Sequence, residues 1–92
     1  MPRDARYITV KNLITAGYIK SFREMFPTIR KSIVAHDLGM NNSRFTTLMN
    51  DVKKFTLEEL YRLAKFLDVD EKVVLNLVHE QYEIDKKKKI KR

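Results

Sequence analysis

Residues 30–50 read RKSIVAHDLGMNNSRFTTLMN, and the pattern of this stretch decides how the chain folds. Apolar residues recur at helical spacing on both sides of Gly39, so the stretch predicts two short helices, over residues 30–38 and 42–51. Gly39 can adopt the left-handed backbone that ends a helix, and Asn41 can accept hydrogen bonds from the free amides that begin the next one. The positions predicted to be buried are Val34, Ala35 and Leu38 before the glycine and Phe45, Leu48, Met49 and Val52 after it.

The second of these helices is predicted to be polar on the side opposite its apolar positions. Ser43, Thr46, Thr47 and Asn50 follow the i, i+3, i+4, i+7 spacing of one helical face. Two short helices joined by a tight turn, the second exposing small hydrogen-bonding side chains, have the geometry of a helix-turn-helix. That motif places its second helix in the major groove of DNA.

The stretch resembles the lambda-repressor-like (Cro-type, or XRE) family of helix-turn-helix DNA-binding proteins. Ala35, Gly39 and Phe45 match the family's alanine, the glycine four residues later and the apolar anchor six residues beyond it, and Leu48 matches the second anchor. Residues 55–77, FTLEELYRLAKFLDVDEKVVLNL, are similar to the family's fourth and fifth helices, and the resemblance covers about residues 29–79. It implies an all-α, compact five- or six-helix bundle that acts as a transcriptional regulator or repressor.

The resemblance also implies where DNA would be contacted. Asn42 and Ser43 fall on exposed positions that reach base edges in the family, and Lys31 on a position that touches the DNA backbone. The chemistry of the side chains is suitable, because Asn pairs with adenine, Ser and Thr bond to several base edges, and Arg reaches guanine or a phosphate. The alternative for each residue is an ordinary solvated helix face. The predicted base contacts are Asn42, Ser43, Arg44, Thr46 and Thr47, and the predicted phosphate contacts are Lys31, Asn50, Lys53 and Lys54.

The net charge of +7 is unevenly distributed along the chain. Residues 86–92, KKKKIKR, hold six basic residues and no acid, whereas residues 1–85 hold 13 basic and 12 acidic residues. Within that body, residues 20–54 carry seven basic and three acidic groups, and residues 55–85 carry three basic and eight acidic groups. The positive part includes the predicted reading helix, as a protein that binds a polyanion with one face requires.

Further helices are predicted on both sides of the motif. Residues 7–16 suit a helix ended by Gly17, although residues 7–10 are rich in β-branched side chains and leave a short extended arm as the alternative. Capping boxes, in which Ser, Thr or Asp precedes Glu by three residues, are predicted at Ser21 with Glu24, Thr56 with Glu59 and Asp68 with Glu71. The additional predicted core residues are Phe22, Met25, Phe26, Ile29, Leu60, Leu63, Ala64, Leu67, Val73, Val74, Leu77 and Val78.

A chain of 92 residues has room for one small domain with tails. We expect a flexible N-terminus over residues 1–6, a DNA-binding domain over residues 7–80 with its motif at residues 30–51, and a basic C-terminal tail over residues 81–92. A block of like charges is typical of disorder. The lack of cysteine and of any apolar run near about 18 residues predicts a soluble cytoplasmic protein that does not contact membranes.

The sequence contains none of the arrangements typical of an active site. There is no HExxH motif, no Cys and His spacing for a metal, no Gly-rich phosphate loop and no serine elbow. His36 and His79 are expected at the surface. We therefore expect no enzyme activity, no catalytic residue, no bound metal and no cofactor, and no small-molecule effector is evident.

The leading hypothesis is sequence-specific binding of double-stranded DNA, in which a homodimer would place two reading helices about one helical turn of DNA apart. One alternative is a protein-interaction module that keeps the fold without reading DNA. The other is a non-specific nucleic-acid binder driven by residues 86–92, whose affinity would come from phosphate neutralisation alone.

Overall fold

Helices account for the regular secondary structure of residues 4–90, the part of the chain that the computed structural model describes, with side chains through Lys88. No strand occurs in that range, so the all-α prediction is confirmed. The α-helices are α1 (Arg6–Thr15), α2 (Lys31–Asp37), α3 (Asn42–Asn50), α4 (Leu57–Leu67) and α5 (Glu71–Ile90), and the 3₁₀ helices are η1 (Phe22–Met25) and η2 (Val52–Lys54).

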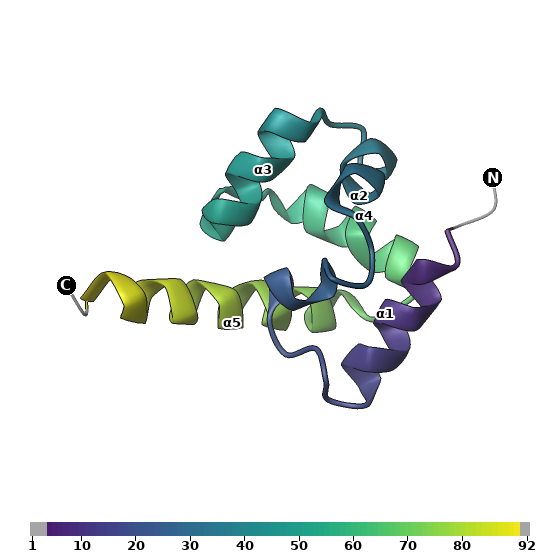
Figure 1. Cartoon of the computed structure of the whole chain (residues 1–92), viewed down its shortest axis with the longest axis horizontal. Coiled ribbons are helices and arrows are strands. Elements are labelled where there is room, and N and C mark those ends of the chain that lie inside the picture. Colours follow the sequence, from purple (N-terminus) through teal and green to yellow (C-terminus); the bar gives the residue numbers. More distant parts are fainter. Residues whose placement is uncertain (1–3, 91–92) are drawn as a thin grey trace.

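The long helix α5 is the base on which the shorter elements are assembled. Helix α4 and both 3₁₀ helices contact α5, α1 contacts α4, and α2 contacts α3. Figure 1 shows α2 and α3 side by side at one edge of the molecule, and the C-terminal half of α5 extending past the rest of the fold. Within residues 4–90, this arrangement leaves one side of α3 exposed to solvent.

Helix α1 begins at Arg6, one residue before the start predicted at Tyr7. Residues 1–3, half of the expected flexible N-terminus 1–6, lie outside the described residues. The carboxylate of Asp4 accepts a hydrogen bond from the Arg6 N–H at 2.8 Å, and the Asp4 carbonyl accepts one from the Tyr7 N–H at 3.0 Å. These bonds satisfy amides that a helix start leaves free, so Arg6 belongs to the helix rather than to a flexible end.

The structure confirms both signals predicted between α1 and α2. Gly17 has φ +87° and follows the end of α1, as predicted. Residues 7–10 lie within α1, so the alternative of an extended arm is excluded. Before η1, the Glu24 carboxylate accepts a hydrogen bond from the Ser21 N–H at 3.0 Å, as the predicted capping box requires.

The turn between α2 and α3 also forms as predicted. Gly39 has φ +76°, and the Met40 N–H donates back to the Ala35 carbonyl at 3.0 Å, which closes the end of α2. Asn41 then caps α3, its side-chain oxygen accepting a hydrogen bond from the Arg44 N–H at 2.8 Å. The left-handed glycine and the asparagine cap thus fix the path of the chain from α2 into α3.

One of the two capping boxes predicted for the last helices is wrong. Thr56 and Glu59 exchange the expected hydrogen bonds at the start of α4, at 2.9 and 3.1 Å. Asp68 instead ends α4 in the left-handed conformation, with φ 57°. Asp70 caps α5, its carboxylate accepting from the N–H two residues on at 2.8 Å. The prediction placed the cap two residues early because α4 needs Asp68 for its own termination.

The core is organised around four phenylalanine rings that come from η1, its following turn, α3 and the segment after η2. The centroid separations of 5.2 to 6.5 Å and the steep angles between rings are those of edge-to-face packing. These rings are Phe22, Phe26, Phe45 and Phe55. The predicted apolar positions of α4 are all buried, as are Val74 and Leu77 of α5, while Val73 and Val78 are half-buried.

Of the basic C-terminal tail expected over residues 81–92, the part through Ile90 is helical and belongs to α5, and residues 91–92 lie outside the described residues. Lysines have good helix propensity, and cations near a helix C-terminus interact favourably with its dipole. Buried Gln81 also ties this part of α5 to the fold. Although α5 has 20 residues, neither it nor any other helix in residues 4–90 combines the length and apolar character that a membrane crossing requires.

Replacing Tyr7 with Phe is expected to lower the free energy of unfolding by about 1–2 kcal/mol. Tyr7 is fully buried, and its hydroxyl donates to the Asp37 carboxylate at 2.8 Å, which links α1 to α2. Burial, followed by the bond to Asp37, raises the pKa of Tyr7 above its ordinary value of 10.0. Because the folded state holds the proton more tightly, this stabilisation is complete below pH 10 and declines above it.

Urea unfolding of both proteins at pH 7 and at several values above pH 10 measures this difference. The contribution of the hydroxyl is the gap between wild type and Tyr7→Phe, since both chains share every other titrating group. A gap that widens above pH 10 would contradict the assignment.

Candidate nucleic-acid interface

Helix α3 has one buried side and one solvent-exposed side, as its sequence predicts. Its anchors Phe45 and Leu48 are buried in the core. Thr46 is half-buried, and the other predicted readers are exposed, namely Asn42, Ser43, Arg44 and Thr47. The side that carries the polar residues therefore faces solvent rather than another part of the described chain.

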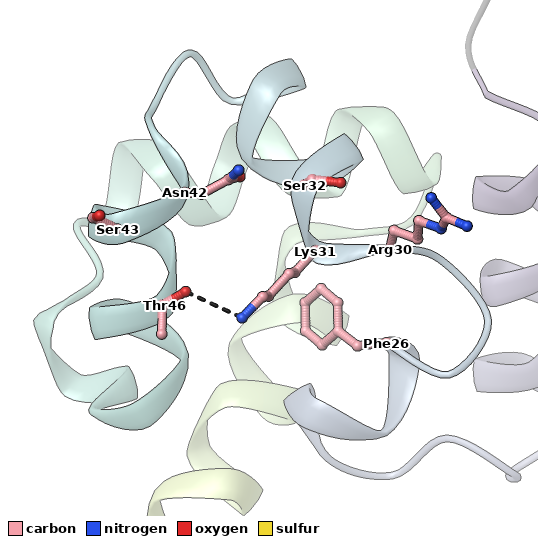
Figure 2. Close-up of a pocket in the computed structure, with 7 residues that line it drawn as sticks. All are labelled: Phe26, Arg30, Lys31, Ser32, Asn42, Ser43 and Thr46. Carbon is pink, nitrogen blue, oxygen red and sulfur yellow. Dashed lines mark hydrogen bonds between the residues drawn. The ribbon is translucent and has the colours of Figure 1, made fainter.

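A hollow of about 720 Å³ lies between α2 and the first turns of α3. Figure 2 shows Asn42 pointing across it toward α2, and the Phe26 ring at its edge. The lining contains two cations and three hydroxyls but no carboxylate, so it favours an anionic partner. The lining residues are Phe26, Arg30, Lys31, Ser32, Asn42, Ser43 and Thr46.

Lys31 connects the two sides of this hollow. Its Nζ donates to the Thr46 hydroxyl at 3.3 Å, as Figure 2 shows. A lysine–threonine bond of this length is weak, and the ammonium stays exposed. A phosphate oxygen could therefore replace the Thr46 hydroxyl at low cost. Arg30 is also exposed, but in Figure 2 its side chain points away from α3.

Arg44 differs from a free base-reading side chain because it is bound to α4. Its guanidinium donates to Glu59 Oε2 at 2.6 Å, while Glu59 Oε1 accepts from the Thr56 N–H at 2.9 Å. Partial burial would raise the pKa of Glu59, but the hydrogen bonds from Thr56 and Arg44 and the positive charge of Arg44 hold that pKa below its usual value. Glu59 is thus charged at neutral pH and would compete with any other anion for Arg44.

The hydroxyl of Thr47 is also partly engaged. It donates to the backbone carbonyl of Ser43 at 3.1 Å, one helical turn earlier. Its methyl group and the acceptor capacity of its oxygen remain available to a partner. Thr47 is therefore better placed to contact a thymine methyl, or to accept a hydrogen bond, than to donate one.

A second hollow, of about 240 Å³, lies at the C-terminal end of α3. Its lining combines two predicted phosphate contacts, Asn50 and Lys53, with residues of α5. Lys53 and Lys54 are exposed, and both lie near the Asp51 carboxylate at 3.8 and 3.9 Å, the outer limit of an ion pair. The complete lining is Asn50, Asp51, Val52, Lys53, Tyr82, Asp85 and Lys86.

Sequence reasoning did not identify Lys86 or Arg23 as part of this surface. Lys86 lines the second hollow beside Asn50, and Arg23 donates to the carbonyl of Met49 at 2.6 Å. The four-residue spacings of Gln81 with Asp85 and of Tyr82 with Lys86 were a usable signal, because they indicate that the helix continues into the basic segment.

One group of acidic residues lies away from this surface. Asp68, Asp70 and Glu71 surround a shallow hollow where α4 meets α5. That junction lies beside α1, as the ion pair between Lys11 and Asp68 at 3.2 Å and Figure 1 both indicate. The separation of charge predicted from the sequence is therefore only partial, because Glu59 pairs with Arg44 and Asp85 lines the second hollow.

Comparison of the chain with protein-family models, with curated proteins and with solved structures gave no match. Within the described residues, no group of three or more His, Asp or Glu side chains is arranged to hold a metal ion. His36 and His79 are exposed, as predicted.

Proposed function

We propose that this protein binds double-stranded DNA sequence-specifically and acts as a transcriptional regulator, most simply a repressor. The observation that carries the proposal is the largely exposed polar side of α3, with Lys31 beside Thr46 in the middle of the helix and Lys53 beside Asn50 at its C-terminal end. The major groove of DNA is about 12 Å wide and admits an α-helix, whose diameter with side chains is about 10–12 Å. The two edges of the major groove are the phosphate backbones, and the lysines would lie against them.

On this proposal α2 and α3 act as a helix-turn-helix of the lambda-repressor-like kind, the family that the sequence resembles. Asn42, Ser43, Thr46 and Thr47 would contact base edges. Arg44 would take part only after exchanging Glu59 for DNA. Lys31 beside Thr46, and Asn50, Lys53 and Lys54 at the C-terminal end of α3, would hold phosphates and so fix how α3 enters the groove.

Selection from a pool of random duplexes near about 0.15 M salt tests the proposal, because non-specific binding is weak at that ionic strength. We expect a defined sequence to be enriched over successive rounds. Binding without enrichment would contradict sequence reading, and the absence of binding would contradict a role on DNA altogether.

Replacing Glu59 with Gln is expected to strengthen duplex binding and to make its salt dependence steeper. Gln can still accept the Thr56 hydrogen bond that caps α4, but it no longer carries the charge that holds Arg44. A released Arg44 can neutralise one more phosphate, so the slope of log K against log salt should become steeper by about 0.9. The free energy of unfolding should change by less than about 1 kcal/mol, since Arg44 is half-exposed.

The matched control is Glu58→Gln, which removes the same charge one residue earlier and releases Arg62 instead, now paired with Glu58 at 3.1 Å. Titrations of the selected duplex at several salt concentrations compare the two variants. Equal slopes for both would show a general charge effect and would contradict a specific competition between Glu59 and DNA.

A further inference from the structure

We propose that the cationic end of α5 is a rigid second arm of the duplex-binding surface, in which Lys86 contacts a DNA phosphate next to the C-terminal end of α3. This inference rests on the proposed function, because the phosphate belongs to the same duplex that α3 would read. It gives a defined position to the basic segment, whose composition alone predicts only a disordered tail that would bind nucleic acid without sequence preference.

A buried polar network attaches this end of α5 to the rest of the fold. The Gln81 side chain is only 3% exposed, its oxygen accepting from the Arg23 N–H at 3.0 Å and its amide donating to Asp85 at 3.2 Å. The Arg23 guanidinium pairs with the same Asp85 carboxylate and also donates to the carbonyl of Met49 at 2.6 Å. Because Met49 belongs to the last turn of α3, this network fixes α5 relative to α3.

Lys86 follows this network directly and lies beside the end of the polar side of α3. It shares the second hollow with Asn50 and Lys53, two of the predicted phosphate contacts. Its ammonium lies 5.8 Å from the centre of the Tyr82 ring and 4.0 Å from Glu83, so it is held near the hollow without a close ion pair. A cation in this position can pair with a phosphate without first breaking a strong contact.

The carboxylates of the second hollow do not oppose an anion as strongly as their number suggests. Asp85 is engaged by Arg23 and Gln81, and Asp51 lies between Lys53 and Lys54. Four cations, Arg23, Lys53, Lys54 and Lys86, thus face three acids, Asp51, Asp85 and Glu83, which leaves one positive charge in excess. The hollow together with these flanking groups is therefore net positive.

The helical state of this segment makes the inference testable with single residues. Successive residues of an α-helix are about 100° apart, so Lys88 points about 200° away from Lys86 and faces the opposite side of α5. Both lysines are exposed, and they carry the same charge two positions apart. If the arm is rigid, Lys86 and Lys88 lie at different distances from the duplex. If the segment is a mobile tail, the two lysines contribute equally to binding.

The experiment compares Lys86→Ala with Lys88→Ala in the full chain, on the duplex enriched by selection, with dissociation constants measured between about 0.05 and 0.3 M salt. For Lys86→Ala we expect affinity to fall about fivefold near 0.15 M salt, and the slope of log K against log salt to become shallower by about 0.9, as the loss of one phosphate contact requires. Lys88→Ala should change affinity by less than about twofold. Lys86→Arg, which keeps the charge, should restore the wild-type slope.

Equal losses in the two alanine variants, or no loss in either, would overturn the inference while leaving the proposed function intact, since the selected sequence would still be bound. Failure of the wild-type chain to enrich any sequence would overturn both. Lys86 is exposed, so both variants should fold, and far-ultraviolet circular dichroism checks that they do.

Discussion

A protein in which Asn42 and Ser43 are both replaced by Ala is expected to bind the selected duplex about 2–4 kcal/mol more weakly than wild type, with unchanged binding to unrelated DNA. Both side chains are exposed at the start of α3 and line the hollow against α2. Asparagine can form two hydrogen bonds to an adenine edge and serine one, and alanine forms none. Because Asn41 is the residue that caps α3, the double variant keeps the helix start and should retain its stability.

Competition titrations with the selected duplex and a scrambled duplex of the same composition measure this loss of discrimination. The matched control is Asn12→Ala with Thr15→Ala, an exposed polar pair on α1, remote from α3 in Figure 1. The control should bind as wild type does. If the Asn42 and Ser43 variant still discriminated between the two duplexes, the side chains that read DNA would have to be sought elsewhere on α3.

The parts of the fold that the sequence predicts correctly are those fixed by neighbouring residues. Gly39 ends α2 because only a few backbone conformations close a helix, and Thr56 caps α4 because its partner Glu59 is three residues away. The assignment of Asp68 fails for a related reason. An aspartate before a helix can cap it or end the previous one, and the choice depends on the length of the turn between the two helices.

The candidate site is less predictable because its contacts join distant parts of the chain. The exposure of Asn42 and Ser43 follows from helical periodicity, and the structure bears it out. The ion pair of Arg44 with Glu59 spans 15 residues, and no local pattern indicates it. Lys86 lies next to Asn50 only because α5 continues past its expected end and is held there by buried side chains. The place of Lys86 beside Asn50 is therefore seen only in the three-dimensional structure.

Replacing Phe45 with Ala is expected to lower the free energy of unfolding by about 3–5 kcal/mol, a large part of the total of about 5–15 kcal/mol for a domain of this kind. The ring is fully buried and lies 5.7 to 6.5 Å, between centroids, from Phe22, Phe26 and Phe55. Alanine would remove these edge-to-face contacts and leave a cavity at the point where α3 joins the core. Helix α3 would then lose its main anchor.

The affinity of Phe45→Ala for the selected duplex should therefore fall by more than the unfolded fraction of the protein alone would cause. Urea unfolding followed by circular dichroism measures the stability, and titration of the selected duplex under conditions where the variant is still folded measures the binding. Thr47→Ala, an exposed change two residues along the same helix, should alter the free energy of unfolding by less than about 0.5 kcal/mol. A loss below about 1 kcal/mol for Phe45→Ala would mean that the site relaxes around the cavity, and that α3 is held by contacts other than the phenylalanine cluster.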